Sequence, residues 1–313
     1  MLITNKQSLR YDKRKDKGLM FFSASSVGDS KAILDANIYE LLVSFHYIKK
    51  AVGTYETEIL PTVKEHDGLF MTDSGVFSFV NSDEEKPPEF YTENYWTNYI
   101  EEYVEFIEKH HKSMFVAANF DLDVIVGHDI VRKWNKKYFE PLEKLTQICY
   151  VAHQNRLGTD DNNGMKHFEE YCRKYKYVGV NQSNKKEAAI IYRLMKKYKV
   201  RVHGFAWTSI PLLRPYPFFS VDSTTWLGGM RYGTSYIYDG KNAKTKDHKN
   251  KYLRKADKLL CDKLGIDMDK LMNDERYEVN RFNLEGWKGF RNEYLKSANT
   301  KLDNYPAHFY NKH

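Results

Sequence analysis

The sequence predicts an α/β protein with a (β/α)8 fold, a TIM barrel, followed by a C-terminal helical and basic appendage. One observation is a series of eight short apolar segments, rich in β-branched and aromatic residues, which are typical of strands buried on both faces. These segments are residues 19–24, 41–48, 68–75, 114–123, 149–155, 177–180, 201–208 and 217–224. Amphipathic helical patterns between them indicate a parallel sheet with helical crossovers. Eight strands in about 210 residues also match the number and usual size of such a barrel.

The helical patterns are clearest in three places. Residues 92–111 begin with Thr92, a candidate N-cap, and repeat apolar residues at every third or fourth position. Residues 165–175 and 185–199 follow the same pattern. A doubly wound open sheet is the alternative fold, although the chain has no G-x-G-x-x-G turn of the dinucleotide-binding type.

The pattern changes after residue 230. The segment that follows is polar, glycine-containing and basic, and residues 251–266 and 284–297 then have helical periodicity. We therefore divide the chain into a catalytic barrel, residues 1–230, and a helical, basic extension, residues 231–313, that packs on the barrel.

Composition limits the classes of function. The formal net charge is +7, with 49 Lys and Arg against 42 Asp and Glu, which permits an anionic partner such as nucleic acid. No apolar run reaches the roughly 18 residues of a membrane span, and the N-terminal sequence lacks the apolar region of a signal peptide. The three cysteines are widely spaced, which argues against a disulfide framework. We expect a cytoplasmic protein, in the host cytoplasm if a phage encodes it, without a membrane partner.

Unusual residues, most of them polar, stand at or near the carboxyl ends of most predicted strands. They are Asp73 and Ser74, Asp121 and Asp123, His153 and Gln154, Gly179, His203, and Asp222. Each could be a helix cap when it is considered alone. In a barrel, however, the carboxyl ends of all strands converge on one mouth, where active sites lie. The set as a whole therefore predicts a functional site.

Two kinds of chemistry suit several carboxylates at one mouth. A metal site could use them together with His128, His153 and His203, but no H-x-H, H-E-x-x-H or D-x-D-x-D spacing is present. The other use is chemistry at a glycosidic bond, in which one carboxylate attacks the anomeric carbon and another transfers protons. Asp73 and Asp222, on nonadjacent strands, could face each other across such a substrate.

Several of these segments resemble a known family. Residues 70–79, FMTDSGVFSF, resemble the D-S-G-G-F-Q segment of the tRNA-guanine transglycosylase superfamily. Residues 41–50, 177–180 and 201–208 occur in the order of that superfamily's barrel strands. Residues 218–226, FFSVDSTTW, are similar to its nucleophile strand, especially in the phage and bacterial DNA-modifying DpdA-type 7-deazaguanine transglycosylases.

The resemblance implies a pentosyltransferase that replaces guanine in a nucleic acid with a 7-deazaguanine such as preQ0, without a cofactor or metal. By this resemblance, Asp222 is the nucleophile and Asp73 the general acid and base. The residues that we expect to bind the base are Asp121, Asp123, Gln154, Gly179, Ser74 and His203. Those that we expect to contact the nucleic acid are Trp226, Arg231, Lys241 and Lys244.

The chain departs from the tRNA enzymes in ways that favour DNA as the polymer. Only Cys261 follows the barrel, so the C-x-C-x-x-C zinc motif is missing, and residues 75–78 read GVFS instead of GGFQ. The predicted partners are DNA in preference to tRNA, a free 7-deazaguanine base and, by analogy, accessory modification proteins such as an amidotransferase or a helicase-like subunit.

Four alternatives remain open from the residues alone. Two of them act on the same glycosidic bond: a nucleoside or nucleotide glycosidase that hydrolyses it, and a tRNA-directed guanine transglycosylase. The others are a nucleic-acid-binding protein built on an inactive barrel and a metal-dependent amidohydrolase.

Overall fold

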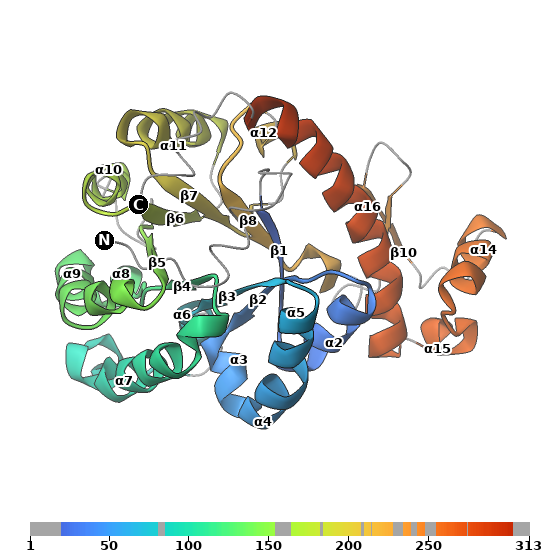
Figure 1. The fold of residues 1–313 in the computed structure, drawn as a ribbon, viewed down its shortest axis with the longest axis horizontal. Helices are drawn as coiled ribbons and strands as arrows, with labels where there is room; N and C mark the ends of the chain where they lie inside the picture. Colours follow the sequence, from blue (N-terminus) through green and yellow to red (C-terminus); the bar gives the residue numbers. More distant parts are fainter. Residues whose placement is uncertain are drawn as a thin grey trace.

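The structure is a computed structural model of the chain. It describes residues 20–80, 85–153, 164–181, 184–207, 210–213, 215–227, 234–238, 243–247, 255–273 and 275–302. Eight parallel strands close into a barrel in chain order (Figure 1), which confirms the predicted (β/α)8 fold. The strands are β1 (Met20–Ser25), β2 (Glu40–Ser44), β3 (Leu69–Asp73), β4 (Val116–Ala118), β5 (Gln147–Val151), β6 (Tyr177–Asn181), β7 (Arg201–Phe205) and β8 (Ser220–Ser223).

Each of the eight predicted apolar segments overlaps one barrel strand, and the second and fourth segments depart most from the prediction. The segment 41–48 forms a strand only to Ser44, and its second half begins a helix. Phe45 and Ile48 are three residues apart and both are buried, so they form the inner face of that helix. The segment 114–123 contributes only Val116–Ala118 to the sheet, and the chain then leaves the strand before the predicted aspartates.

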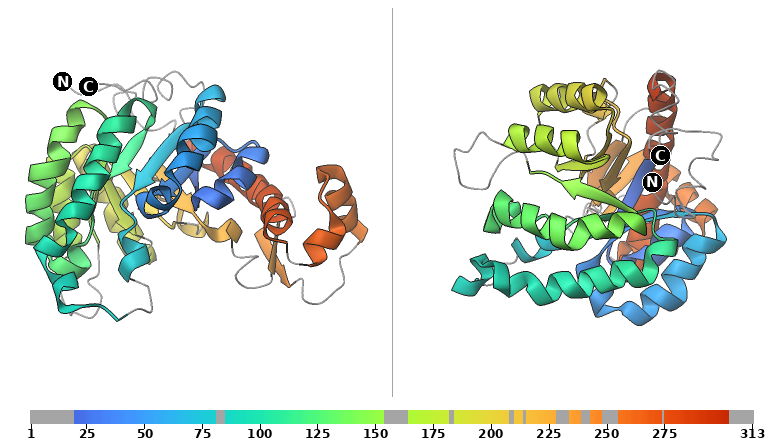
Figure 2. Two further views of the ribbon diagram at one scale, coloured as in Figure 1. Left: turned by 90° about the horizontal axis from the view of Figure 1, so that it is seen from below. Right: turned by 60° about the vertical axis from the view of Figure 1, so that its left-hand side comes forward.

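Helices surround the barrel, as Figures 1 and 2 show. The helices of the barrel are α2 (Val27–Asp35), α3 (Phe45–Lys50), α4 (Val52–Thr54), η1 (Tyr55–Ile59), α5 (Leu60–Glu65), α6 (Val76–Val80), η2 (Pro88–Tyr91), α7 (Glu93–His110), η3 (His111–Ser113), α8 (Asp123–Val126), α9 (His128–Trp134), η4 (Asn135–Phe139), η5 (Glu140–Lys144), α10 (Gly164–Lys174), α11 (Lys185–Tyr198), α12 (Ile210–Leu213) and η6 (Thr225–Leu227). The three helices predicted from periodicity are α7, α10 and α11. A capping box at Asn184 and Glu187 explains where α11 begins.

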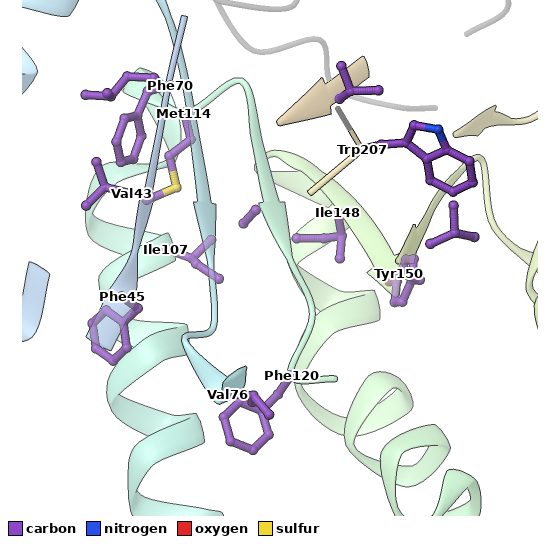
Figure 3. Packing of buried hydrophobic residues seen from close by; sticks show 14 of the residues in the cluster. Val43, Phe45, Phe70, Val76, Ile107, Met114, Phe120, Ile148, Tyr150 and Trp207 are labelled. Atoms are coloured by element: carbon purple, nitrogen blue, oxygen red, sulfur yellow. The ribbon is translucent and has the colours of Figure 1, made fainter. Parts of the chain in front are cut away.

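The core has two layers because side chains alternate along each strand. In β2, Leu41 and Val43 belong to the large cluster between strands and helices, whereas Leu42 belongs to a smaller cluster. Figure 3 shows part of the large cluster around the labelled side chains. The smaller cluster includes Phe22 and Met71. Since these residues alternate with those of the outer layer, they fill the inside of the barrel and support the polar residues at its mouth.

The C-terminal extension comprises helices and a hairpin. Its elements are β9 (Thr234–Tyr238), β10 (Ala243–Asp247), α14 (Lys255–Leu264), α15 (Met268–Met272) and α16 (Arg276–Leu302). The antiparallel pair β9–β10 was not expected from the sequence. Leu284 and Trp287 of α16 belong to the large core cluster, so this helix packs directly on the barrel. In Figure 2, α14 and α15 lie beyond the hairpin, away from the barrel. Within the described ranges, no helix combines the length and apolarity needed to cross a membrane.

Candidate active site

A pocket of about 840 Å³ opens at the carboxyl ends of the barrel strands. Its wall contains three of the predicted carboxylates, Asp73, Asp121 and Asp222, and also the His153 side chain. This volume is within the usual range of small-molecule sites, which is about 300–1,000 Å³. The predicted convergence of strand-end side chains therefore holds for these residues.

Asp222 is held firmly at one end of the pocket. It lies in β8, is only 6% exposed, and pairs in register with Phe22 of β1. Its Oδ1 atom accepts hydrogen bonds from the Ala206 N–H at 3.0 Å and from His203 Nε2 at 3.1 Å. Ala206 has a φ of +53°, in the left-handed region that alanine seldom adopts. This unusual backbone directs an N–H at the carboxylate, which is a common device at functional sites.

His203 does not line the pocket, although the sequence predicts that it binds the base. Its side chain is 0% exposed and lies within the barrel, behind Asp222. When Nε2 donates to Asp222, Nδ1 accepts from the Ser220 hydroxyl at 2.7 Å, and Ser220 also bonds to the Tyr177 hydroxyl. This buried chain fixes the imidazole, and the imidazole in turn orients the carboxylate.

Asp73 ends β3 in register with Ser44 of β2. Its Oδ1 atom accepts from the Gly75 N–H at 2.9 Å. Gly75 has a φ of +79°, and a Cβ there would lie 2.5 Å from the Ser44 hydroxyl, so the tight turn after Asp73 requires glycine. Burial and the negative charges of Asp121 and Asp222 raise the pKa of Asp73 to about 7, although the Ser44 hydroxyl opposes the rise. At neutral pH Asp73 thus exists in both protonation states.

Asp121 lies three residues beyond β4, on the same pocket wall. The Ser74 hydroxyl donates to Asp121 Oδ1 at 2.9 Å and itself lines the pocket. Burial raises the pKa of Asp121, the charge of His153 lowers it, and the charge of Asp123 raises it again. Asp121 and Ser74 therefore occupy positions suited to the base-binding role that the sequence predicts for them.

Asp123 is in a second layer behind the pocket and does not line it. It is 2% exposed, and its Oδ1 atom accepts from His153 Nδ1 at 2.5 Å. Its Oδ2 atom lies 3.4 Å from Nδ1 of His128. Although the sequence predicts that Asp123 binds the base, it does not line the pocket, because the chain leaves β4 early and Asp123 begins a helix instead of continuing the strand.

His153 connects the two aspartates. Its Nε2 atom lies 3.6 Å from Asp121 Oδ2, while its Nδ1 atom contacts Asp123. Burial alone would lower the pKa of His153, but the charges of Asp123 and Asp121 outweigh burial and raise it to about 9. The raised pKa favours the imidazolium form of His153 at neutral pH, and the ring, whose side chain is 14% exposed, lies between two carboxylates.

The other predicted residues fall into two groups. Gly179 lies in β6, where a Cβ would be 2.6 Å from the Phe205 ring, so glycine makes room for that ring, which itself lines the pocket. Trp226 is 0% exposed and its Nε1 donates to the Ala24 carbonyl, so its indole packs in the core and has no face open to nucleic acid. Gln154, Arg231 and Lys241 lie outside the described residues, and only the backbone of Lys244, in β10, is described.

The pocket also contains residues that the sequence analysis missed. Phe77, in the short helix after Asp73, lines the pocket and is 78% exposed. Arg276 of α16 lines it too, and donates to both carboxylate oxygens of Asp29 in α2 at 2.8 and 2.6 Å. Phe77 could have been suspected as an apolar residue directly after a predicted site, whereas nothing in the sequence links positions 29 and 276.

In the part of the chain that the structure describes, no group of three or more His, Cys, Asp or Glu side chains is arranged to hold a metal ion. A comparison of the sequence with models of known protein families and with curated proteins finds no match.

Proposed function

We propose that this protein is a base-exchange transglycosylase that replaces guanine in DNA with a 7-deazaguanine such as preQ0, through a covalent intermediate on Asp222. One observation carries the proposal: two carboxylates of unlike character line the same pocket. Asp222 accepts hydrogen bonds from the Ala206 N–H and from Nε2 of the buried His203, which hold its carboxylate in a fixed orientation. Asp73, with a pKa of about 7, can both give and take a proton near neutral pH.

The reaction has two displacements. In the first, an Asp222 oxygen forms a bond to C1′ of the deoxyribose as the bond from C1′ to guanine N9 breaks, and protonated Asp73 supplies the proton that the departing base needs. In the second, the incoming 7-deazaguanine gives its N9 proton to ionised Asp73. Its N9 then attacks C1′, and the ester bond to Asp222 breaks. The sugar configuration is retained, and both carboxyl groups return to their starting states.

The remaining pocket residues suit a purine base. The Asp121 carboxylate can accept from the N1–H and the exocyclic amine of a guanine-type base. The exposed ring of Phe77 offers a face on which a base can stack. A base within a duplex must leave its stack to reach a barrel mouth, so the polymer is flipped or single-stranded at the target.

The preference for DNA depends on the sequence. The resemblance of residues 218–226 to the DNA-modifying branch supports it, as does the missing zinc motif of the tRNA enzymes. The net charge of +7 is compatible with either polymer.

The test is an incorporation assay on the full chain. Single-stranded and duplex DNA with tritiated guanine, and an unmodified tRNA with the same label, are each incubated with unlabelled preQ0. We expect label to leave DNA as free guanine with an equal amount of preQ0 incorporated. Guanine release without incorporation would instead indicate a glycosidase, and exchange confined to tRNA would indicate the tRNA-directed enzyme. Binding of DNA without release of any base would contradict all three and leave the inactive-barrel alternative.

A further inference from the structure

The proposed reaction assigns no role to His153, a titratable group in the pocket wall. His153 follows β5 closely, lines the pocket beside Asp121, and is not needed for either displacement. The two nitrogens of its ring have different surroundings. Nδ1 points to Asp123, which does not line the pocket, whereas Nε2 is on the side of Asp121, which does.

The geometry leaves Nε2 available to a ligand. Its distance of 3.6 Å from Asp121 Oδ2 is too long for a good hydrogen bond. Nδ1 is 2.5 Å from Asp123 Oδ1, and when Asp123 is ionised this contact places a proton on Nδ1. Nε2 therefore carries a hydrogen only when the ring is an imidazolium, and the pKa of about 9 supports that state at neutral pH.

The groups around the ring are arranged to keep this charge on His153. Asp123 also faces His128, but burial holds the pKa of His128 below its usual value. His128 stacks on His167 at 3.6 Å, and Arg132, which bonds to His167, is itself paired with Asp129 and Glu170. Asp123 therefore stabilises the cation on the pocket side of the cluster, at His153.

We propose that His153 and Asp121 form a specificity pair that recognises a lactam edge, selecting a 6-oxopurine base over its 6-amino counterpart. The inference rests on the proposed function and goes further, since it assigns the residue that recognises the exocyclic oxygen. His153 Nε2–H donates to O6, and the adjacent N1–H of the base donates to Asp121 Oδ2. In a 6-amino base the donor and acceptor at positions 6 and 1 are exchanged. Its amino group then faces the Nε2–H donor, and its unprotonated N1 faces the carboxylate of Asp121.

The experiment measures direct base binding, which needs neither DNA nor turnover. Equilibrium dialysis of the full chain at pH 7 is carried out with three probes: 7-deazaguanine, 7-deazahypoxanthine and 2,6-diamino-7-deazapurine. The wild-type protein should bind both oxo bases, and should bind the diamine about 10- to 100-fold more weakly than 7-deazaguanine, in line with the value of a bidentate contact. This comparison depends on no variant, and equal binding of the diamine would overturn the inference.

Two variants then locate the preference. His153→Leu removes the donor and should reduce the preference to within about threefold, whereas His153→Gln keeps an N–H and should retain part of it. His66→Leu is the matched control, because His66 is exposed, stacks only on Tyr39 among its described ring contacts, and does not line this pocket. It should leave the preference unchanged. Circular dichroism checks that each variant is folded. If His153→Leu is unfolded, the binding preference of His153→Gln is compared with that of wild type instead.

The outcomes separate the two proposals. A wild-type preference for oxo bases that persists in both His153 variants would overturn the role of His153 and leave base exchange intact. Failure of the wild-type protein to bind any of the three bases would overturn the proposed function and this inference with it.

Discussion

The two ends of the pocket stabilise their carboxylates in opposite ways. At one end, Asp222 is held by an amide N–H and by a buried histidine whose other nitrogen bonds to Ser220. At the other end, the His153 ring lies between Asp121 and a second aspartate, Asp123. The first arrangement uses dipoles and fixed geometry, which suits a group that must form a bond along one direction. The second uses charge balance, which suits recognition of a polar base edge.

Asp73 shows the consequence of lying within reach of both ends. Burial and the charges of Asp121 and Asp222 together raise its pKa to about 7, and neither neighbour offers it a cation in return. Asp73, whose pKa is raised by burial and by two neighbouring carboxylates, is therefore the carboxyl group suited to exchange protons.

The largest effect that we predict is at the Asp222 end. Asp222→Asn should keep its hydrogen bond from Ala206 but lose the nucleophile, so kcat for base incorporation should fall by at least about 10⁴-fold. Denaturing gels of wild-type protein with DNA should show a covalent adduct that the variant lacks. Asp129→Asn, at an aspartate whose side chain is 89% exposed, is the control and should be fully active. Activity of Asp222→Asn within tenfold of wild type would rule out Asp222 as the nucleophile.

Asp73 is expected to have the next largest effect. Asp73→Asn should reduce kcat by about 10²- to 10⁴-fold, the usual contribution of a general acid and base. In the wild type, the acid form of Asp73 is lost as pH rises through about 7, so the rate of guanine release should fall above that pH. The variant should have no such decline. A wild-type decline that survives in Asp73→Asn would assign the proton transfer to another group.

The same substitution should increase stability in alkaline buffer. Because the pKa of Asp73 is raised from 3.8 to about 7, its stabilising contribution is complete below 3.8 and is lost as pH rises through 7. Asparagine is always neutral, so the variant should be more stable than wild type at pH 8, by on the order of 1–2 kcal/mol. Thermal unfolding at pH 4 and pH 8 measures the difference, which should disappear at the lower pH. Equal unfolding temperatures at both pH values would show that Asp73 is not destabilised by its neighbours.

How much of the site the sequence could predict depends on where each residue lies relative to a strand end. The eight apolar runs located the strands, and the convergence of strand ends then placed Asp73, Asp121 and Asp222 at one mouth. Asp123 lies behind the pocket because β4 ends at Ala118, and the alternation of side chains along a strand no longer applies five residues later.

Two further features could not be predicted because they depend on tertiary packing. His203 is in the middle of β7. Its side chain contacts Asp222 and not the pocket because of the direction in which it points from the strand. Ala206 has a backbone conformation for which sequence gives no signal, since glycine or asparagine is the usual residue there.

A fourth prediction tests whether His203 acts through orientation. His203→Gln should lower kcat by about 100-fold with little change in KM, because a displaced nucleophile weakens catalysis more than binding. Ser220→Ala breaks the same hydrogen-bond chain one step further away, and should have a smaller effect in the same direction. Steady-state kinetics on both variants separates kcat from KM. A rise in KM with unchanged kcat would instead place His203 in binding, as the sequence had suggested.

The smallest predicted effect is at Asp121, and it connects the two ends of the pocket. Removing its charge in Asp121→Asn removes one of the causes of the raised pKa of Asp73, so that pKa should fall. The decline in guanine release with pH should therefore begin at a lower pH than in wild type, while the affinity for 7-deazaguanine drops about tenfold through loss of the carboxylate acceptor. Rates measured at saturating base concentration isolate the pH effect from the affinity effect. Because Asp222 is unchanged in this variant, its charge should still keep the pKa of Asp73 above 3.8. If the pH profile of Asp121→Asn coincides with that of wild type, the two ends of the pocket titrate independently.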